Sequence, residues 1–279
     1  MKLFIDVGGT NLRSELHTSS EIISQKVSSQ ERELVKYIEH LLVLYPLISF
    51  IGISFAGQIF EGEILSAPNL HVSEPKIKEY FESRYNLRLE IENDLKCAVV
   101  AEAEFIKSDS IVALYVGTGI GSAFIDEGKL IRGVKNQAFE IGHISYKEAP
   151  FACGCSKTNC LELFASGSGM NRWMKHFNIP KLLLDELENS KEKHTKEIAI
   201  SFKEALLYAV AILITLCNPE VLVLGGGVIK NNEYLLKYIK ENLEGYVQKN
   251  TLEEVQIVVS SLKNGSMEGA KLLDGNPYG

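Results

Sequence analysis

The stretch Leu3-Phe4-Ile5-Asp6-Val7-Gly8-Gly9-Thr10 decides the fold, because it is an apolar strand that runs directly into a glycine turn. The same arrangement recurs at Leu114-Tyr115-Val116-Gly117-Thr118-Gly119. The segments 12–17 and 122–125, which follow the two turns, have the pattern of a second strand. Two such hairpins, one near the start of each half, predict a duplicated α/β architecture with a cleft between the halves.

Other segments extend this pattern along the chain. Further strands are predicted at 21–27, 49–55, 87–91, 111–116, 129–131, 221–224 and 255–259, and helices at 31–45, 77–85, 93–105, 197–217, 232–248 and 267–273. The polar residues 107–110 are the predicted domain boundary. We therefore expect an N-terminal α/β domain over 1–108 and a C-terminal α/β domain over 109–263, with the helix in 264–279 as a candidate addition to the first.

Composition excludes several classes of protein. The chain has 279 residues, of which 46% are hydrophobic and 23% charged, and this is ordinary for a globular protein. Its net charge of −7 repels phosphate backbones, so nucleic acid is not expected as a partner. The apolar stretch 205–217 is shorter than the roughly 20 residues of a bilayer helix, so no membrane partner is expected either.

The cysteines and the N-terminus indicate the compartment. Asp6 lies where an export signal needs apolar residues. Five cysteines cannot all pair, and three of them, Cys153, Cys155 and Cys160, are clustered, which favours a metal site in a reducing environment. We therefore expect a cytoplasmic protein.

The glycine turns are candidate phosphate-binding loops. Gly117-x-Gly119-x-Gly121 precedes a strand and not a helix, so it does not fit the dinucleotide-binding fingerprint. In a hairpin, such glycines let backbone N–H groups converge on an anion. Thr10 and Thr118 would add hydroxyl donors, and Asp6 is placed to hold Mg²⁺ through water. The alternative is that both segments are only tight hairpins.

A second cluster has the chemistry of a zinc site. His143, Cys153, Cys155 and Cys160 form the pattern H-x9-C-x-C-x4-C, and thiolates with imidazole are ligands that Zn²⁺ prefers. Four protein ligands close the coordination sphere, so the metal is expected to be structural. The alternative is a set of free loop thiols beside an unrelated histidine.

Three carboxylates are candidate functional groups. Asp94 follows Asn93 where a predicted strand gives way to a helix, so it is either a helix cap or a base that accepts a proton from an attacking hydroxyl. Glu140 and Glu162 flank the predicted zinc ligands, and a metal would fix their directions for binding a polyhydroxy ligand. Taken singly, each glutamate is more typical of a solvated surface residue.

Taken together, these motifs resemble the ROK family, which comprises repressors, open reading frames and kinases. The resemblance rests on Asp6-Val-Gly-Gly-Thr10, Glu92-Asn93-Asp94, Gly117-Thr-Gly-Ile-Gly121, Glu140-Ile-Gly-His143 with the cysteine block through Glu162, and Gly225-Gly-Gly-Val228. It implies the two-domain fold of the sugar kinase and actin superfamily, which is ribonuclease H-like, with the active site in the cleft between the domains.

The resemblance also implies an activity. Asp94 would be the base for a hexose hydroxyl, usually O6, in ATP-dependent phosphorylation with Mg²⁺, and glucose is the first candidate substrate, before N-acetylmannosamine, N-acetylglucosamine and fructose. It implies sugar contacts from Asn69, Asn93, Asp94, Glu140, His143 and Glu162. It implies an ATP site formed by Asp6, Gly8, Gly9, Thr10, Gly117, Thr118, Gly119, Gly121, Gly225, Gly226 and Gly227. Structural Zn²⁺ and a homodimer are implied as well.

Two rival functions remain open. One is a sugar-sensing regulator of the same family, but the resemblance implies a helix-turn-helix before the first glycine motif of a regulator, and none is expected before Asp6. The other is a non-catalytic scaffold stabilised by zinc, which the presence of Asp6, Asp94 and both glycine turns disfavours. Asn11 stands where many kinases of the family have lysine, and this and similar differences leave the preferred sugar undecided.

Overall fold

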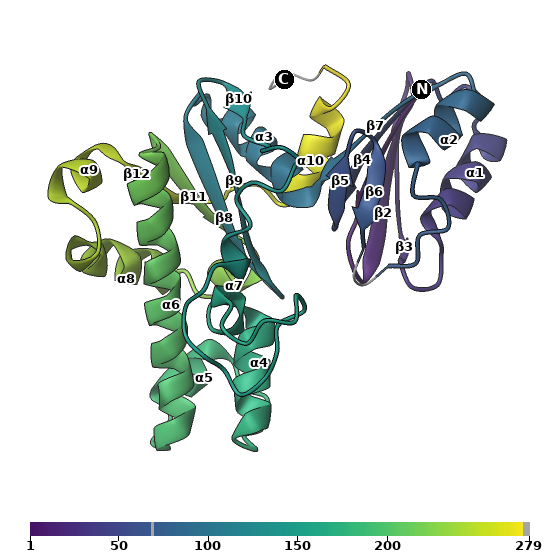
Figure 1. Ribbon diagram of the computed structural model, residues 1–279. Helices are drawn as coiled ribbons and strands as arrows, with labels where there is room; N and C mark the ends of the chain where they lie inside the picture. Colours follow the sequence, from purple (N-terminus) through teal and green to yellow (C-terminus); the bar gives the residue numbers. More distant parts are fainter. Residues whose placement is uncertain (68–69, 276–279) are drawn as a thin grey trace. The chain divides into compact units, whose positions relative to one another are not determined.

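The computed structural model describes residues 1–67 and 70–275, which form two compact units (Figure 1). Unit 1 comprises Met1–Lys107, Gly128–Ala138 and the chain from Leu262 onward, and unit 2 comprises Ser108–Glu127 and Phe139–Ser261. The expected C-terminal domain included Gly128–Ala138, which the structure instead groups with unit 1. Arg132 and Asn136 of this segment donate hydrogen bonds to the buried Glu92 of unit 1, and no local sequence pattern reveals these contacts.

Unit 1 is built around a five-stranded sheet. The strands of this sheet are β1 (Lys2–Val7), β2 (Asn11–His17), β3 (Ile22–Ser28), β4 (Phe50–Phe55) and β7 (Arg88–Asn93). A separate hairpin consists of β5 (Gln58–Phe60) and β6 (Glu63–Ser66). The helices of unit 1 are α1 (Leu34–Leu44), α2 (Ile77–Arg84), α3 (Asp94–Ile106) and α10 (Gly265–Leu272). The strand order is β3-β2-β1-β4-β7, in which β1 pairs antiparallel with β2 and parallel with β4.

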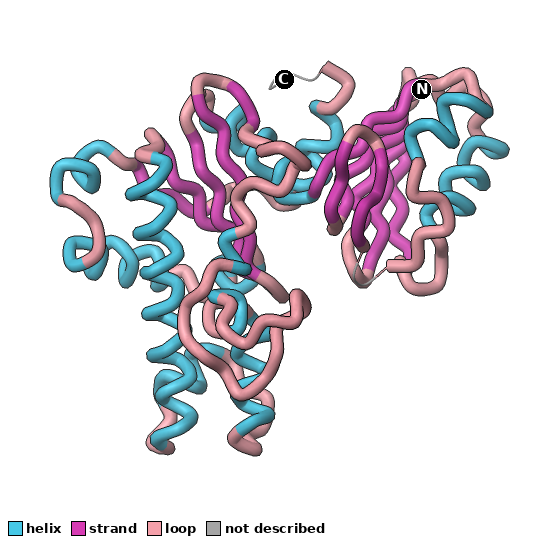
Figure 2. The backbone as a smooth tube through the Cα atoms, viewed as in Figure 1, coloured by secondary structure: helices cyan, strands magenta, loops and turns pink. Residues whose placement is uncertain are grey.

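Alternation along β1 divides its side chains between the two faces of this sheet. Leu3, Ile5 and Val7 are buried in one cluster with residues of α1 and α2, whereas Phe4 packs with Met267 of α10 on the opposite face. Helices thus cover both faces of the sheet (Figure 2). Asp6 lies two residues after Phe4 in β1, so its side chain is on the same face of the sheet as Phe4, which is the face that α10 covers.

Close packing at two glycines fixes α10 on unit 1. A Cβ at Gly269 would lie 1.9 Å from the carbonyl oxygen of Cys97 in α3, and one at Gly52 in β4 would lie 2.5 Å from the carbonyl oxygen of Ala270. Backbone atoms cannot swing away as the tip of a long side chain can. The absence of side chains at these positions therefore lets α10 lie against both α3 and the sheet.

Gly269→Ala is expected to destabilise the protein by about 2 to 3 kcal/mol, because overpacking against backbone outweighs the roughly 1 kcal/mol that alanine gains over glycine in a helix. Chemical denaturation monitored by circular dichroism measures this loss. Gly245→Ala is the control, since a Cβ there meets no atom within 4 Å. Equal stability of the two variants would contradict the packing argument.

Unit 2 contains most of the second sheet. The strands of that sheet are β8 (Ile111–Val116), β9 (Ile120–Asp126), β10 (Lys129–Leu130), β11 (Val221–Gly225) and β12 (Gln256–Val259). The α-helices are α4 (Gly167–His176), α5 (Leu184–Asn189), α6 (Lys193–Cys217), α7 (Gly227–Lys230), α8 (Tyr234–Asn242) and α9 (Lys249–Glu254), and the 3₁₀ turns are η1 (Ile141–His143), η2 (Leu161–Leu163) and η3 (Leu243–Gly245). The helix expected over 232–248 is thus divided into α8 and η3.

The two sheets share one topology, which confirms the duplication expected from the two hairpins. The order β10-β9-β8-β11-β12 matches that of the first sheet strand for strand, with β8 antiparallel to β9 and parallel to β11. Each glycine turn therefore connects the central strand of its sheet to the antiparallel neighbour. Both turns follow the carboxyl end of a central strand, where open α/β sheets bind their ligands.

The helix α6 is longer than expected, because it begins at Lys193. By length and composition it is apolar enough to cross a membrane, yet 61% of its most apolar window is buried by the rest of the protein, as in the core helix of a globular domain.

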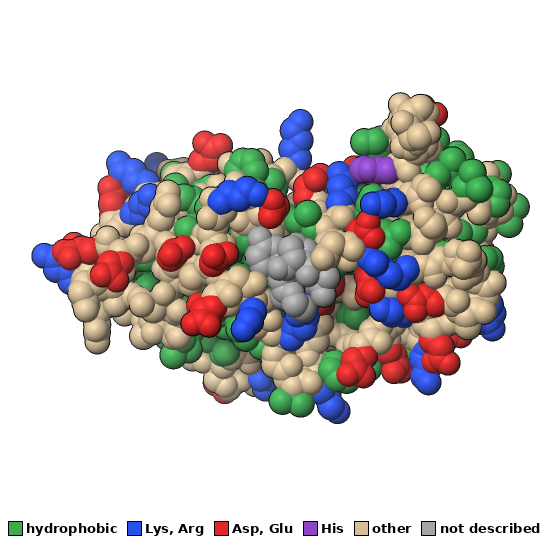
Figure 3. Space-filling view, turned by 90° about the horizontal axis from the view of Figure 1, so that it is seen from above, with side chains coloured by type: hydrophobic (Ala, Val, Ile, Leu, Met, Phe, Trp, Pro, Cys, Tyr) green, Lys and Arg blue, Asp and Glu red, His purple; other side chains and the backbone are tan. Residues whose placement is uncertain are grey.

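On the face shown in Figure 3, Lys and Arg side chains are interspersed with Asp and Glu, so the acidic excess is not gathered into one patch there.

Candidate active site and metal centre

Asp94 lies at the junction of β7 and α3, and its neighbour Asn93 performs the capping. The Asn93 Oδ1 atom accepts hydrogen bonds from the amides of Leu95 (3.0 Å) and Lys96 (3.2 Å). Asp94 Oδ1 accepts from Asn93 Nδ2 (3.2 Å) and from the Leu95 amide (2.9 Å). Since Asn93 accepts from both of these amides and Asp94 shares only that of Leu95, the half-buried Asp94 carboxylate is oriented at the helix start without being its main cap.

The first glycine turn keeps two amides available. Its Gly8 amide donates to the carbonyl oxygen of Asn11 at 2.9 Å, which closes the hairpin. Within residues 1–67 and 70–275, the amides of Gly9 and Thr10 have no hydrogen-bond partner. Open N–H groups at a tight turn can bind an anion.

Asp6 is held beside this turn by two donors. Its Oδ2 atom accepts from Arg13 Nη1 and from Asn264 Nδ2, each at 3.0 Å, although the side chain is almost fully buried. Asn264 also caps α10, which links the carboxylate to the helix packed on the sheet. The sequence predicts Asp6 as a Mg²⁺ residue but gives no signal for Arg13, a cation on the neighbouring strand whose charge offsets that of Asp6.

The second glycine turn has the same construction. The Gly117 amide donates to the carbonyl oxygen of Gly119 at 2.9 Å, and the Ile120 amide donates to Glu162 Oε2 at 3.3 Å. In the described part of the chain, the amides of Thr118 and Gly119 have no hydrogen-bond partner. Each turn thus presents two adjacent open donors, one from glycine and one from threonine.

Two further glycine segments meet this second turn. Gly226 adopts a left-handed φ of 86°, and a Cβ there would lie 2.3 Å from the carbonyl oxygen of Val116. At the start of α4, the amides of Gly167 and Ser168 donate to the carbonyl oxygens of Gly117 and Thr118, each at 2.9 Å. These α4 amides brace the turn. The sequence analysis missed this brace, although Ser166-Gly-Ser-Gly169 is a recognisable helix start.

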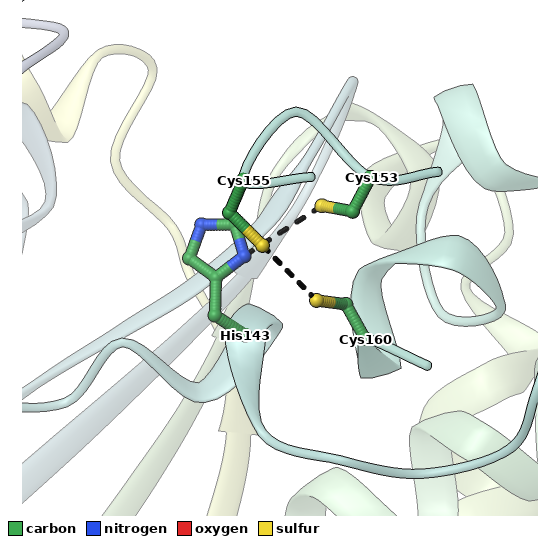
Figure 4. A group of neighbouring side chains, drawn as sticks. All are labelled: His143, Cys153, Cys155 and Cys160. Carbon is green, nitrogen blue, oxygen red and sulfur yellow. Dashed lines mark hydrogen bonds between the residues drawn. The ribbon is translucent and has the colours of Figure 1, made fainter. Parts of the chain in front are cut away.

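The four predicted zinc ligands lie together in unit 2 (Figure 4). One ligand atom from each of His143, Cys153, Cys155 and Cys160 lies within 4.8 Å of the others. Cys153 Sγ is 3.7 Å from His143 Nδ1, and Cys155 Sγ is 3.3 Å from Cys160 Sγ. None of the cysteines forms a disulfide within the described residues.

This donor set fits zinc. A tetrahedron with Zn–S bonds near 2.3 Å has edges of about 3.8 Å, and the ligand atoms lie between 3.3 Å and 4.8 Å apart. Burial, followed by the neighbouring thiols, raises the pKa of Cys160 to about 12. The Cys160 thiol therefore keeps its proton unless a cation replaces it.

The predicted sugar-binding residues in unit 2 flank this cluster. Glu140 is exposed and precedes η1, and His143 ends η1 with its Nδ1 directed to the cysteines (Figure 4). Glu162 lies in η2, where Oε1 accepts from Cys153 Sγ (3.6 Å) and Oε2 from the Ile120 amide. Glu162 therefore connects the cysteine loop with the second glycine turn. The predicted sugar contact Asn69 lies outside the described residues.

Comparison with known proteins agrees with this geometry. Residues 3–274 match the sequence model of the ROK family. The chain is 29% identical over 223 residues to a glucokinase of Halalkalibacterium halodurans, which covers 72% of this chain and 67% of that protein. It is 30% identical over 182 residues to an N-acetyl-D-glucosamine kinase of Vibrio parahaemolyticus, which covers 60% of each. The chain thus matches about two thirds or less of these relatives' lengths.

A solved structure shares the fold. The ROK hexokinase of Thermus thermophilus superposes with a TM-score of 0.80 at 24% identity, over 97% of this chain and 96% of that one. The duplicated sheets are therefore those of the two-domain, actin-like fold. Since the family's sequence model matches nearly the whole chain, and since the fold is the one its solved members adopt, the chain belongs to the ROK family.

Proposed function

We propose that this protein is an ATP-dependent sugar kinase that phosphorylates a hexose, with glucose as the first candidate and glucose 6-phosphate as the product. The observation that carries the proposal is the Asn93–Asp94 pair. A capped helix start orients one half-buried carboxylate, while Asn93 supplies the cap that Asp94 would otherwise have to provide. The glucokinase similarity supports this choice of sugar.

Asp94 has the role of general base in this proposal. Phosphoryl transfer passes through a loose transition state, so catalysis depends mainly on positioning and on stabilising charge. Asp94 orients the sugar hydroxyl in line with the transferred group and accepts its proton as the new P–O bond forms. Fixing Oδ1 by two hydrogen bonds limits rotation of the carboxylate, which favours one orientation of the hydroxyl.

The glycine turns bind the ATP phosphates in this account. The open amides of Gly9, Thr10, Thr118 and Gly119 supply donors that need no reorganisation. Asp6 is the residue that would hold Mg²⁺, which supplies positive charge to the phosphate oxygens. The third glycine segment, Gly225–Gly227, is proposed as part of the nucleotide site because Gly226 lies directly against the strand end that precedes Gly117.

The sugar contacts in unit 2 are proposed to depend on zinc. With Nδ1 of His143 on the metal, the other ring nitrogen is directed elsewhere and can meet a sugar hydroxyl. Glu140 and Glu162 supply carboxylate acceptors on either side. The metal itself has a structural task, which is to hold the loop that carries these side chains.

N-acetylglucosamine is the second candidate substrate, favoured by the similarity to the Vibrio kinase. N-acetylmannosamine and fructose complete the set that the family resemblance implies. A coupled assay of ADP release with each of the four sugars, ATP and Mg²⁺ identifies the substrate by the highest kcat/KM. Sugar binding without any ADP release would contradict the kinase proposal and would instead indicate a sugar-sensing regulator.

We also propose a cytoplasmic homodimer. The clustering of three cysteines with His143 as a candidate metal site supports a reducing compartment, and the family resemblance supports the dimer. Size-exclusion chromatography with light scattering measures the mass in solution, and a monomer at micromolar concentration would contradict the second part.

A further inference from the structure

A buried glutamate, Glu92, lies two residues before the proposed base Asp94 in the sequence. Glu92, in β7, is only 7% exposed. Its Oε1 atom accepts hydrogen bonds from the Asn93 amide (2.8 Å) and from Asn136 Nδ2 (2.7 Å), and its Oε2 atom accepts from Arg132 Nε (3.1 Å). Both Arg132 and Asn136 belong to Gly128–Ala138, which we call the crossing segment because the chain on either side of it belongs to unit 2.

Asn136 joins the crossing segment to three elements of unit 1. Besides its bond to Glu92 in β7, its Nδ2 donates to the carbonyl oxygen of Ile59 in β5 at 2.8 Å. Its own carbonyl oxygen accepts from Lys96 Nζ of α3 at 2.7 Å. Asn136 is 9% exposed and has a left-handed φ of 57°, a conformation that asparagine tolerates better than most residues. Its backbone conformation thus suits this position, and its Nδ2 is used twice, whereas its Oδ1 is buried without a hydrogen-bond partner among the described residues.

A continuous series of hydrogen bonds leads from this residue to the proposed base. Asn136 donates to Glu92, Glu92 accepts the Asn93 amide, and the Asn93 side chain donates to Asp94. The charges at this site also favour a fixed β7–α3 junction. Arg132 forms an ion pair with Glu92, so the buried carboxylate two residues before Asp94 is compensated. An uncompensated charge there would favour rearrangement of the β7–α3 junction.

We propose that Asn136 and Arg132 are positioning residues for Asp94, which they hold through Glu92 and Asn93. The proposal rests on the proposed function, in which Asp94 is the base. It adds that the crossing segment, whose chain continues to Glu140, sets the orientation of that base. Since misplacement of a reacting group by 1 Å can cost about 100-fold in rate, loss of this support should appear in kcat.

Asn136→Gly tests the proposal, because glycine keeps the left-handed φ and removes only the side chain. We expect kcat to fall about 10- to 100-fold while the KM values for sugar and ATP change by less than about threefold. Arg132→Gln, at a half-buried position, should lower kcat in the same direction by a smaller factor. The matched control is Gln137→Ala. It removes a different hydrogen bond between the crossing segment and the rest of unit 1, which Gln137 Nε2 donates to Gln58 Oε1 at 3.0 Å.

Hydrogen exchange gives a readout that does not depend on activity. In Asn136→Gly the amides of Leu95 and Lys96 should exchange at least about tenfold faster than in the parent protein, since Glu92 behind their acceptor Asn93 has lost one of its hydrogen bonds, although Asn93 Nδ2 keeps its bond to the carbonyl oxygen of Gly57. Exchange in the core strand β4 should be unchanged, and Gln137→Ala should alter neither region.

Two results would overturn the proposal. One is a kcat for Gln137→Ala as low as that of Asn136→Gly, and the other is unchanged exchange at Leu95 and Lys96. If the parent protein phosphorylates no sugar, the proposed function fails, whereas the exchange comparison still decides whether Asn136 orders the start of α3.

Discussion

Asp94→Asn is expected to lower kcat by about 10³- to 10⁴-fold, because the amide cannot accept the proton of the sugar hydroxyl. Sugar affinity should stay within a few-fold of the parent value. Asparagine has the same shape, and its side-chain oxygen can still accept from the Leu95 amide and from Asn93 Nδ2. Steady-state kinetics give kcat, and isothermal titration with the sugar gives the affinity.

Asp109→Asn is the matched control for Asp94→Asn, since Asp109 is an exposed aspartate in the polar turn before β8. The control removes the same charge and should leave both turnover and affinity unchanged. If sugar affinity of Asp94→Asn fell in step with its turnover, Asp94 would be a binding residue and the assignment of the base would be wrong.

Cys155→Ser is expected to remove the metal and with it most of the sugar affinity. Cys155 is the exposed member of the cluster, so serine in its place should create no cavity in the core. A structural zinc contributes directly to the stability of the loop it closes. Loss of a hydrogen-bond partner of a metal ligand typically costs about 10- to 100-fold in metal affinity or activity, so loss of a ligand should cost at least as much. Elemental analysis should give one zinc per parent chain and less than one per variant chain.

Cys217→Ser is the control for this experiment, because Cys217 lies at the end of α6 and outside the cluster. It should retain zinc and activity. Limited proteolysis should cut the Cys155→Ser protein within the loop between η1 and η2 and spare the control. A metal-free Cys155→Ser protein with full activity would refute the structural role of the metal.

The fold was largely predictable because its determinants are local. The apolar run before each glycine turn and the alternation after it define the two hairpins, and the stripe of α1 and the apolar run of α6 define helices. The candidate zinc ligands were predictable as well, because three of them lie in one short loop and are therefore clustered in the sequence. Even the ambiguity at Asp94 was visible, and only the structure could show that Asn93 performs the capping.

The contacts that the sequence did not reveal are long-range. Asn136 and Glu92 are 44 residues apart, and Asn264 and Asp6 are 258 apart, so no periodicity relates them. The crossing segment contains only the short strand β10 as regular structure, and two of its side chains donate hydrogen bonds to Glu92 of unit 1. The packing of α10 depends on the missing side chain of Gly269, which is visible only once α3 is placed against it.

Product analysis of one reaction mixture tests the central claim most directly. Zinc-loaded protein is incubated with glucose, ATP and Mg²⁺, and the phosphorylated species are followed by ³¹P NMR. We predict that glucose 6-phosphate and ADP accumulate in equal amounts, and that neither forms with Asp94→Asn on the same time scale. Glucose, N-acetylglucosamine, N-acetylmannosamine and fructose all left unphosphorylated by the zinc-loaded protein would contradict the account.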